Sequence, residues 1–352
     1  MLLFSELTAA AQTAYAQVVD ASLSTGHMRS VADLSGSFAA KTVKGHKYWY
    51  YQYTEPSGAL RQLFVGPDNE AVRSLIARKN QPGASHALGP LTHAATALGC
   101  SAVPARQFRV IRRLAEYGFF NAGGVLIGTH AYLCYGNMLG VRWVAAEGTQ
   151  DIDFAHSGKS LSLALPSNLE VRTQEAIDSL RMGFLPVSGL SGKAGGAYLI
   201  PHEPEFRLDF LTTLHRGKEQ PYEHDQLHVT LQPLKFMEFS LQQVQQTALL
   251  SSDGAVMVNV PHPARYALHK LLVFGEREGG FLAKSMKDLR QAASILAYFK
   301  EYRAWEVDDH WHDLIGRGKG WRSRALRGLA ALNKAFPALE IKEWLMSLQA
   351  QS

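Results

Sequence analysis

The stretch Val125-Leu-Ile-Gly-Thr129, followed about twenty residues later by Thr149-Gln-Asp-Ile-Asp-Phe154, decides the fold. Alternate side chains of a strand point to opposite faces, so Asp151 and Asp153 lie side by side while Ile152 turns into the core. Two neighbouring carboxylates repel each other unless a cation lies between them, and such hard oxygen ligands suit Mg²⁺ with phosphate oxygens. The pattern indicates a metal site, although an Asp-x-Asp triplet also occurs by chance in many chains of this length.

Helical and strand-like segments alternate around this stretch, which predicts a fold of mixed α and β elements. Beyond Pro261 the pattern is almost wholly helical. The expected helices are 104–120, 131–139, about 168–182, 265–274, 283–300 and 324–348, and the expected strands are 125–127, 141–144, 197–200 and 206–211.

The first hundred residues carry a pattern of their own. Apolar residues spaced by three and four from Phe4 to Val18 predict an amphipathic opening helix. The aromatic run 47–53, a turn cluster and the segment 60–65 predict a β-hairpin. Its rings could fill a core or stack bases, and because neighbours point to opposite sides only one face could meet a ligand. One face carries Trp49, Tyr51 and Tyr53, and the other carries Tyr48 and Tyr50.

The chain is long enough for two or three domains, with 352 residues of which 46% are hydrophobic. Small and turn-forming residues make 80–89 the best candidate for a linker. We therefore expect a helix and aromatic hairpin module in 1–100, a central domain in 101–215 and a mainly helical domain in 216–352.

The charge balance is mildly basic. The sequence has 36 Lys and Arg against 31 Asp and Glu, a net charge of +5, which permits binding to polyanions without requiring it. Cys100 and Cys134 are too few for a disulfide framework or a Cys-based zinc site and indicate a reducing compartment. The first twenty residues lack the basic start of a signal peptide, and no stretch offers ~20 uninterrupted apolar residues. We expect a cytoplasmic protein with no membrane partner.

Three features together resemble the nucleotidyltransferase superfamily, which has the DNA polymerase β-like fold. They are Gly128-Thr129 at a strand end, the Asp151-Ile-Asp153 strand, and a later strand acid, Asp209, in Phe206-Arg-Leu-Asp-Phe210. The similarity is greatest to a bacterial group related to the AbiEii and MenT toxins, in which Thr-x-Asp-Ile-Asp also appears, and it covers about 106–297. Thr129 departs from the usual second Gly or Ser, and the gap to Asp151 is long.

The resemblance implies an α+β fold, a mixed sheet with flanking helices, whose catalytic domain is 101–215. It also implies transfer of a nucleoside monophosphate from an NTP to an acceptor hydroxyl with two Mg²⁺ ions. The metal-binding and catalytic residues would be Asp151, Asp153 and Asp209. The nucleotide-binding residues would be Gly128, Thr129, Thr149, Lys270 and Lys287. For the two lysines the alternative is a solvated charge on an amphipathic helix.

The acceptor is expected to be an RNA, such as a tRNA-like end, or a protein. Residues 314–337 hold six Lys or Arg and no acidic residue, and glycines at 316, 318 and 320 predict an adaptable loop there. Arg106, Arg109 and Arg113 would form a second basic strip on a helix. The ordinary alternative is that these charges balance helix dipoles and maintain solubility. The rival function is a non-catalytic interaction or antitoxin-like protein that keeps the fold without turnover.

Overall fold

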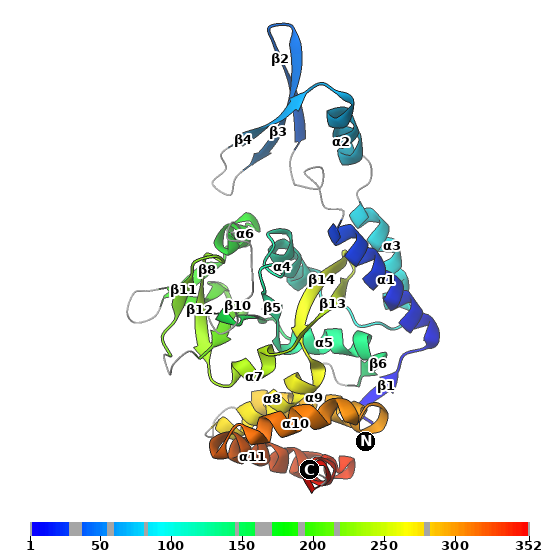
Figure 1. Ribbon diagram of the computed structural model, residues 1–352, viewed down its shortest axis with the longest axis vertical. Coiled ribbons are helices and arrows are strands. Elements are labelled where there is room, and N and C mark those ends of the chain that lie inside the picture. The colour runs from blue at the N-terminus through cyan, green and yellow to red at the C-terminus, as the bar shows by residue number, and fades with distance from the viewer. Residues whose placement is uncertain are drawn as a thin grey trace.

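The computed structural model describes residues 2–27, 37–54, 60–80, 84–144, 148–158, 171–188, 194–214, 219–277 and 282–350. Figure 1 shows a small sheet with one helix at one end, a central sheet in the middle and a stack of helices at the other end. Within the described ranges, no helix is both long and apolar enough to cross a membrane.

A seven-stranded mixed sheet forms the centre, which confirms the expected α+β architecture. Its path runs β11-β12-β10-β7-β5, while β9 pairs with both β10 and β8. Strands β7 and β12 are parallel to β10, whereas β9 is antiparallel to β10 and β5 is antiparallel to β7. The strands are β5 (Val125–Leu126), β7 (Ile152–His156), β8 (Leu185–Ser188), β9 (Ala194–Ile200), β10 (Glu203–Thr213), β11 (Tyr222–His224) and β12 (Val229–Leu234).

Strand β10 shows why these residues form a half-buried strand. Phe206, Leu208 and Phe210 are buried, whereas Arg207 and Asp209 alternate with them on the other face. The Phe210 ring stacks on Phe154 of β7 with 5.3 Å between centroids. Burial of each such ring stabilises the fold by roughly 1.5–3 kcal/mol. The apolar residues thereby fix which face of the sheet is left for the polar ones.

Four helices flank this sheet: α4 (Ala105–Glu116), α5 (Gly128–Leu139), α6 (Thr173–Ser179) and α7 (Met237–Leu241). Helix α5 begins directly at Gly128, three residues earlier than expected. Helix α6 is shorter than the expected 168–182, and 159–170 lie outside the described residues. Helix α4 buries Phe108, Ile111 and Leu114, which form the apolar side of its 3.6-residue repeat.

The C-terminal region is helical, as expected, but its division differs. The expected helix 324–348 is wrong as one element, because Pro337 cannot continue the hydrogen-bond ladder and starts a 3₁₀ turn, η3 (Pro337–Leu339). The expected loop around Gly316–Gly320 is also wrong, since only Arg317 and Gly318 separate two helices. The helices are α8 (Pro263–Glu276), α9 (Leu282–Tyr302), α10 (Trp305–Gly316), α11 (Lys319–Ala335) and α12 (Ile341–Ala350).

Helices α8 and α11 touch through their backbones. A Cβ added to Gly275 would lie 2.0 Å from the carbonyl oxygen of Arg324, and one added to Gly328 would lie 2.0 Å from that of Leu271. Only glycine therefore allows the two helices to pack at this separation.

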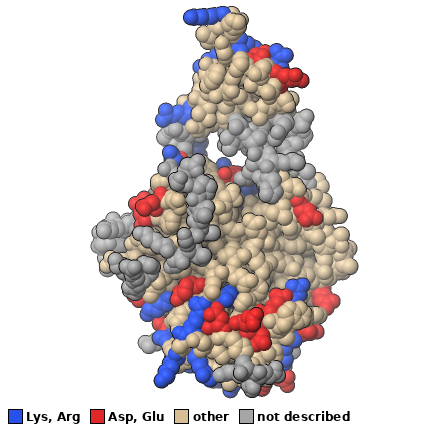
Figure 2. All heavy atoms as spheres, viewed as in Figure 1, with Lys and Arg blue, Asp and Glu red and all other residues tan. Residues whose placement is uncertain are grey.

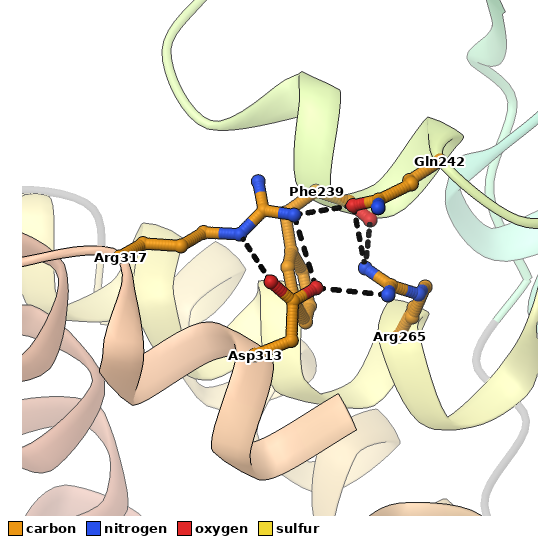
Figure 3. A network of polar contacts seen from close by, with 5 residues as sticks. All are labelled: Phe239, Gln242, Arg265, Asp313 and Arg317. Carbon is orange, nitrogen blue, oxygen red and sulfur yellow. Dashed lines mark hydrogen bonds and ion pairs between the residues drawn. The ribbon is translucent and has the colours of Figure 1, made fainter. Parts of the chain in front are cut away.

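A partly buried ionic network joins α7, α8 and α10 (Figure 3). Asp313 accepts from Arg265 Nη2 at 2.8 Å and from Arg317 Nε at 2.9 Å, and Gln242 Oε1 accepts from both arginines. Arg265 also donates to the Phe239 carbonyl at 3.2 Å. Charges removed from water need such partners, so the network fixes how α8 lies beneath the sheet.

The N-terminal segment partly corrects the expected opening helix. Phe4 lies in a short strand, β1 (Phe4–Glu6), antiparallel to β6 (Val141–Trp143), and α1 starts only at Ala9 (Ala9–His27). Helix α1 packs on α3 (Ala84–Ala97) and on the hairpin of β13 (Val244–Ser251) and β14 (Gly254–Pro261). Residues 84–89 of the expected linker 80–89 therefore begin a helix, α3, which holds five alanines in all, while 81–83 lie outside the described residues.

The aromatic hairpin is confirmed and gains a third strand. Strands β2 (Ser37–Val43), β3 (His46–Thr54) and β4 (Leu60–Pro67) form an antiparallel sheet with β3 in the middle, followed by α2 (Glu70–Asn80).

Candidate active site

The parallel pairing of β7 and β10 brings two of the predicted acids together. Asp209 is directly opposite Asp153, and their flanking residues Leu208 and Ile152 are fully buried. The register therefore sets both carboxylates on the same face of the sheet. Arg207 shares that face and its Nη2 lies 2.6 Å from Asp209 Oδ1, so Asp209 has a cationic neighbour.

Gly128 lies against the carboxylate of Asp153. The Ile127 amide donates to the Asp153 carbonyl at 3.0 Å, which extends the β5–β7 pairing up to the start of α5. Gly128 has φ +65°, and a Cβ built there would lie 2.1 Å from Asp153 Oδ2. Position 128 thus requires glycine both for its backbone and for the space beside the acid.

The first turn of α5 begins at this glycine. No side chain caps the helix, and its N-cap residue, Ile127, has extended backbone. The first backbone N–H groups of a helix have no intrahelical partner, and the helix dipole favours negative charge there. Thr129 is buried in this turn, with its hydroxyl 3.5 Å from Gln291 Nε2. The predicted Gly128-Thr129 pair therefore occupies an anion-favouring position beside Asp153.

Asp151 stands just before β7 and accepts a hydrogen bond from the Thr149 hydroxyl. Thr149 itself is held by its carbonyl, which accepts from Gln107 Nε2 of α4 at 3.4 Å. His130 of α5 is 2% exposed, and burial lowers its pKa to about 4. Asp151 raises that pKa and Lys287 lowers it, so both charges act on the same imidazole. Asp151 and Lys287 of α9 therefore both lie within electrostatic range of His130.

Tyr266 and Gln291 are site residues that the sequence analysis missed. The Tyr266 hydroxyl lies 2.9 Å from the Gly128 carbonyl and 2.8 Å from Gln291 Oε1, and its single proton can serve one of them at a time. The pKa of Tyr266 is raised well above its ordinary value, mainly because the hydroxyl is buried and secondly because the negative charges of Asp288 and Asp153 are near. A usable signal existed, because Tyr266 precedes Lys270 by one helical turn and Gln291 follows Lys287 by one.

Lys270 is close to this group but is already paired. Its Nζ lies 5.1 Å from the centre of the Tyr266 ring and 2.5 Å from Asp288 Oδ1. Arg277 Nη1 lies 2.7 Å from Asp288 Oδ2, so one buried carboxylate holds two cations. Burial opposes the ionised form of Asp288, yet the two cations leave its pKa lower than usual. Asp288 thereby positions both positive groups.

The donor chemistry at β7 and β10 fits Mg²⁺, since Asp153 and Asp209 lie on adjacent strands and Asp151 directly precedes β7. As the side chains stand, however, no three His, Cys, Asp or Glu in the described part of the chain are grouped closely enough to hold an ion. Thr149 engages Asp151 and Arg207 engages Asp209. Thr149 engages only one oxygen of Asp151, whereas the positive charge of Arg207 would have to move away from Asp209 for a metal ion to bind there.

The expected basic strip on α4 is corrected. Arg106 pairs with Glu203, Arg113 pairs with Glu116 at 3.0 Å, and Arg109 donates to the Leu180 carbonyl at 3.2 Å. Arg106 and Arg109 thereby join α4 to neighbouring segments, whereas the Arg113 pair lies within α4 itself. In the basic segment 314–337 Arg324 pairs with Glu276, whereas Lys319, Arg322 and Arg327 border a shallow, open depression of about 530 Å³ on α11.

A family model described as "Nucleotidyltransferase" matches residues 106–316, more than half of the chain. Among solved structures, an antigenic nucleotidyltransferase-like protein from Paracoccidioides brasiliensis aligns at 15% identity over 70% of this chain and 95% of that one, with a TM-score of 0.34. Comparison with curated proteins gave no match.

Proposed function

Because the chain belongs to the nucleotidyltransferase family, we propose that it transfers a nucleoside monophosphate from an NTP to an acceptor hydroxyl. The observation that carries the proposal is the group formed by Asp153, Asp209 and Gly128. Two carboxylates share one face of the sheet, and an uncapped helix start, whose backbone N–H groups favour an anion, lies beside them.

Asp151, Asp153 and Asp209 would hold Mg²⁺. When bound, Mg²⁺ would neutralise phosphate charge and favour ionisation of the acceptor hydroxyl. Asp209 would accept the proton of that hydroxyl, whose oxygen then attacks the α-phosphorus while pyrophosphate leaves. Arg207, now paired with Asp209, would release the carboxylate and remain close enough to contact the acceptor.

The triphosphate would lie between α5 and the two helices α8 and α9. Backbone N–H groups at Gly128 and Thr129 would bind phosphate oxygens, and Thr149 would hold Asp151 in place. Lys270 and Lys287 would offset phosphate charge from the other side. Tyr266 supports this arrangement, since it links the Gly128 carbonyl to the helix that carries Lys270.

We propose that the acceptor is an RNA. We also retain as a proposal the relation to AbiEii- and MenT-like proteins, which the Thr-x-Asp-Ile-Asp pattern suggested. The three cationic side chains Lys319, Arg322 and Arg327, gathered around a shallow depression on α11, support this, because clustered positive charge suits a phosphodiester backbone.

The test is to incubate the full-length protein with Mg²⁺ and each of four α-labelled NTPs, in the presence of total RNA or of an RNase-treated extract. Pyrophosphate release and a labelled macromolecule are expected for at least one NTP, and label in RNA would identify the acceptor class. Labelled protein instead of RNA would contradict the acceptor proposal alone, whereas no pyrophosphate under any condition would contradict transfer.

A second candidate is a nucleotide-binding protein without turnover. It is favoured by the internal pairing of the site, in which Arg207 neutralises Asp209 and Asp288 neutralises Lys270. This candidate predicts saturable NTP binding with no pyrophosphate release in any extract.

A further inference from the structure

The N-terminal sheet presents two different faces. On one face Tyr51 is only 1% exposed, and the Trp49 indole donates to Asp68 Oδ1 at 2.9 Å, just before α2. On this face the aromatic side chains of β3 make contacts within the module. The run of aromatic residues in β3 is therefore explained on this side by packing.

The opposite face, here called the aromatic face, consists of Lys41, Tyr48, Tyr50 and Phe64. Phe64 lies 5.5 Å from Tyr50 and 6.0 Å from Tyr48 between ring centroids, so the three rings form one continuous surface. Phe64 is 61% exposed, and Leu60, which alternation places on the same face of β4, is 63% exposed. Single exposed apolar residues are common, whereas exposed rings that adjoin one another in a patch are typical of binding surfaces.

Positive charge accompanies these rings. Lys41 Nζ lies 4.9 Å from the centre of the Tyr50 ring and 2.5 Å from Gln62 Oε1. Residues 37–80 contain seven Lys or Arg against three Asp or Glu, a surplus of four, in a chain whose total surplus is five. Figure 2 shows Lys and Arg atoms at the far tip of this module and on its flanks. Nearly all of the net positive charge thus belongs to one eighth of the sequence.

We propose that the aromatic face binds single-stranded nucleic acid, with unpaired bases stacking on Tyr48, Tyr50 and Phe64 and with Lys41 contacting a phosphate. Flat rings on an open sheet offer stacking that any base can use, and basic residues around them attract the backbone. The bases of a duplex are already stacked on one another, so a duplex would gain only the attraction between its phosphates and the basic residues. The inference is independent of nucleotide transfer, because neither NTP nor Mg²⁺ takes part.

The net positive charge of the module favours nucleic acid over a second copy of the chain as its ligand. An apolar patch alone would suit a second copy of the chain, but two modules with a surplus of four positive charges each would repel. A polyanion with exposed bases satisfies both the rings and the charge.

The experiment measures fluorescence anisotropy of labelled 12-mers with the full-length protein in EDTA, without NTP, from 50 to 300 mM salt. The arms are single-stranded RNA, single-stranded DNA of the same sequence and a duplex. The test variants are Tyr50→Leu with Phe64→Leu, which keep apolar bulk in the strands but remove the stacking surface. Tyr53→Leu is the matched control, since it makes the same change on the same strand but on the opposite face.

Both single-stranded probes are expected to bind, and the Tyr50→Leu, Phe64→Leu variant should bind them about tenfold or more weakly, while Tyr53→Leu is unchanged. Lys41→Ala should reduce the slope of log affinity against log salt by about one. Binding to only one of RNA and DNA, lost in the double leucine variant, would support the same face and show that it also contacts the sugar. Duplex binding as tight as single-strand binding, or an affinity indifferent to the double leucine variant, would overturn the proposal. Self-association that this variant abolishes, without any oligonucleotide binding, would assign the face to a second copy instead.

Discussion

Asp153 of β7 and Asp209 of β10 are directly opposite each other on neighbouring parallel strands. Their strand neighbours are buried phenylalanine, leucine and isoleucine side chains, so neither acid can turn to the other face without exposing core. Two like charges held this close cost free energy unless a cation joins them. The core of the sheet therefore holds two carboxylates on one face, and in this structure the Arg207 guanidinium is the cation beside one of them.

The first prediction concerns the charge of these acids. Asp153→Asn keeps the size of the side chain but removes the charge, so it should lower nucleotide transfer by at least about a hundredfold. The folded state should be retained, as measured by circular dichroism and urea unfolding. Asp253→Asn, in the turn between β13 and β14, is the control and should transfer normally. A fully active Asp153→Asn protein would remove this acid from the catalytic group.

A second prediction uses the space at position 128. Gly128→Ala would place a methyl group against Asp153 Oδ2 and force a strained backbone, so transfer and NTP binding should both fall by tenfold or more, on the order of 1.4 kcal/mol or above. NTP binding is measured by isothermal titration. Gly148→Ala is the matched control, because a Cβ there meets nothing within 4 Å. Equal behaviour of the two variants would show that the close approach to Asp153 has no role.

The third prediction tests whether Asp288 holds two cations. Asp288→Asn should lower the free energy of unfolding by about 1–3 kcal/mol, because Lys270 and Arg277 lose their partner while staying partly hydrated. The pKa of Asp288 is lower in the folded protein, so its contribution is complete above about pH 4 and is lost as the pH falls through the folded pKa. Urea unfolding at pH 7 gives the difference. A double cycle with Lys270→Met should show coupling between the two positions, and strict additivity would argue against the pairing.

Local sequence patterns predicted those parts of the site that depend on alternation. The alternation of Asp151, Ile152 and Asp153 predicts a strand with its acids on one face. Phe206-Arg-Leu-Asp-Phe210 has the same alternation, and the structure places Asp153 and Asp209 on a shared face. The same reasoning could not show which charges are already used. Lys270 looks available on its own helix because its partner, Asp288, comes from another one.

The segments that were predicted wrongly depend on distant partners. Phe4 has a helical spacing to Leu7 and Ala11, yet it lies in a strand because β6 offers a free edge that no local pattern reveals. Arg106 seemed to face solvent and instead pairs with Glu203. The assignment of Asp151, Asp153 and Asp209 to a metal stays a prediction, and so do the roles of Lys270 and Lys287.

The last prediction follows from histidines that are neutral in the folded protein. The Nδ1 atom of His156 accepts from the Gly158 amide at 3.0 Å while Nε2 faces the Ala122 carbonyl at 3.0 Å, so both nitrogens are occupied by the neutral form. Burial, with the His224 ring 4.7 Å away, lowers the pKa of His156 to about 4, and burial lowers that of His262 to about 4.

Because these pKa values are lower in the folded state than the 6.5 of an unfolded histidine, the unfolded chain binds more protons below that pH. Stability is therefore complete above about pH 6.5 and falls as the pH drops towards 4, by roughly 1.4 kcal/mol per pH unit for each such histidine. His156→Asn retains an acceptor for the Gly158 amide but cannot be protonated, so its urea midpoint should fall less steeply between pH 6.5 and 5. His93→Asn on the exposed side of α3 should keep the wild-type slope, and a His156→Asn slope equal to it would mean that His156 is not neutral in the fold.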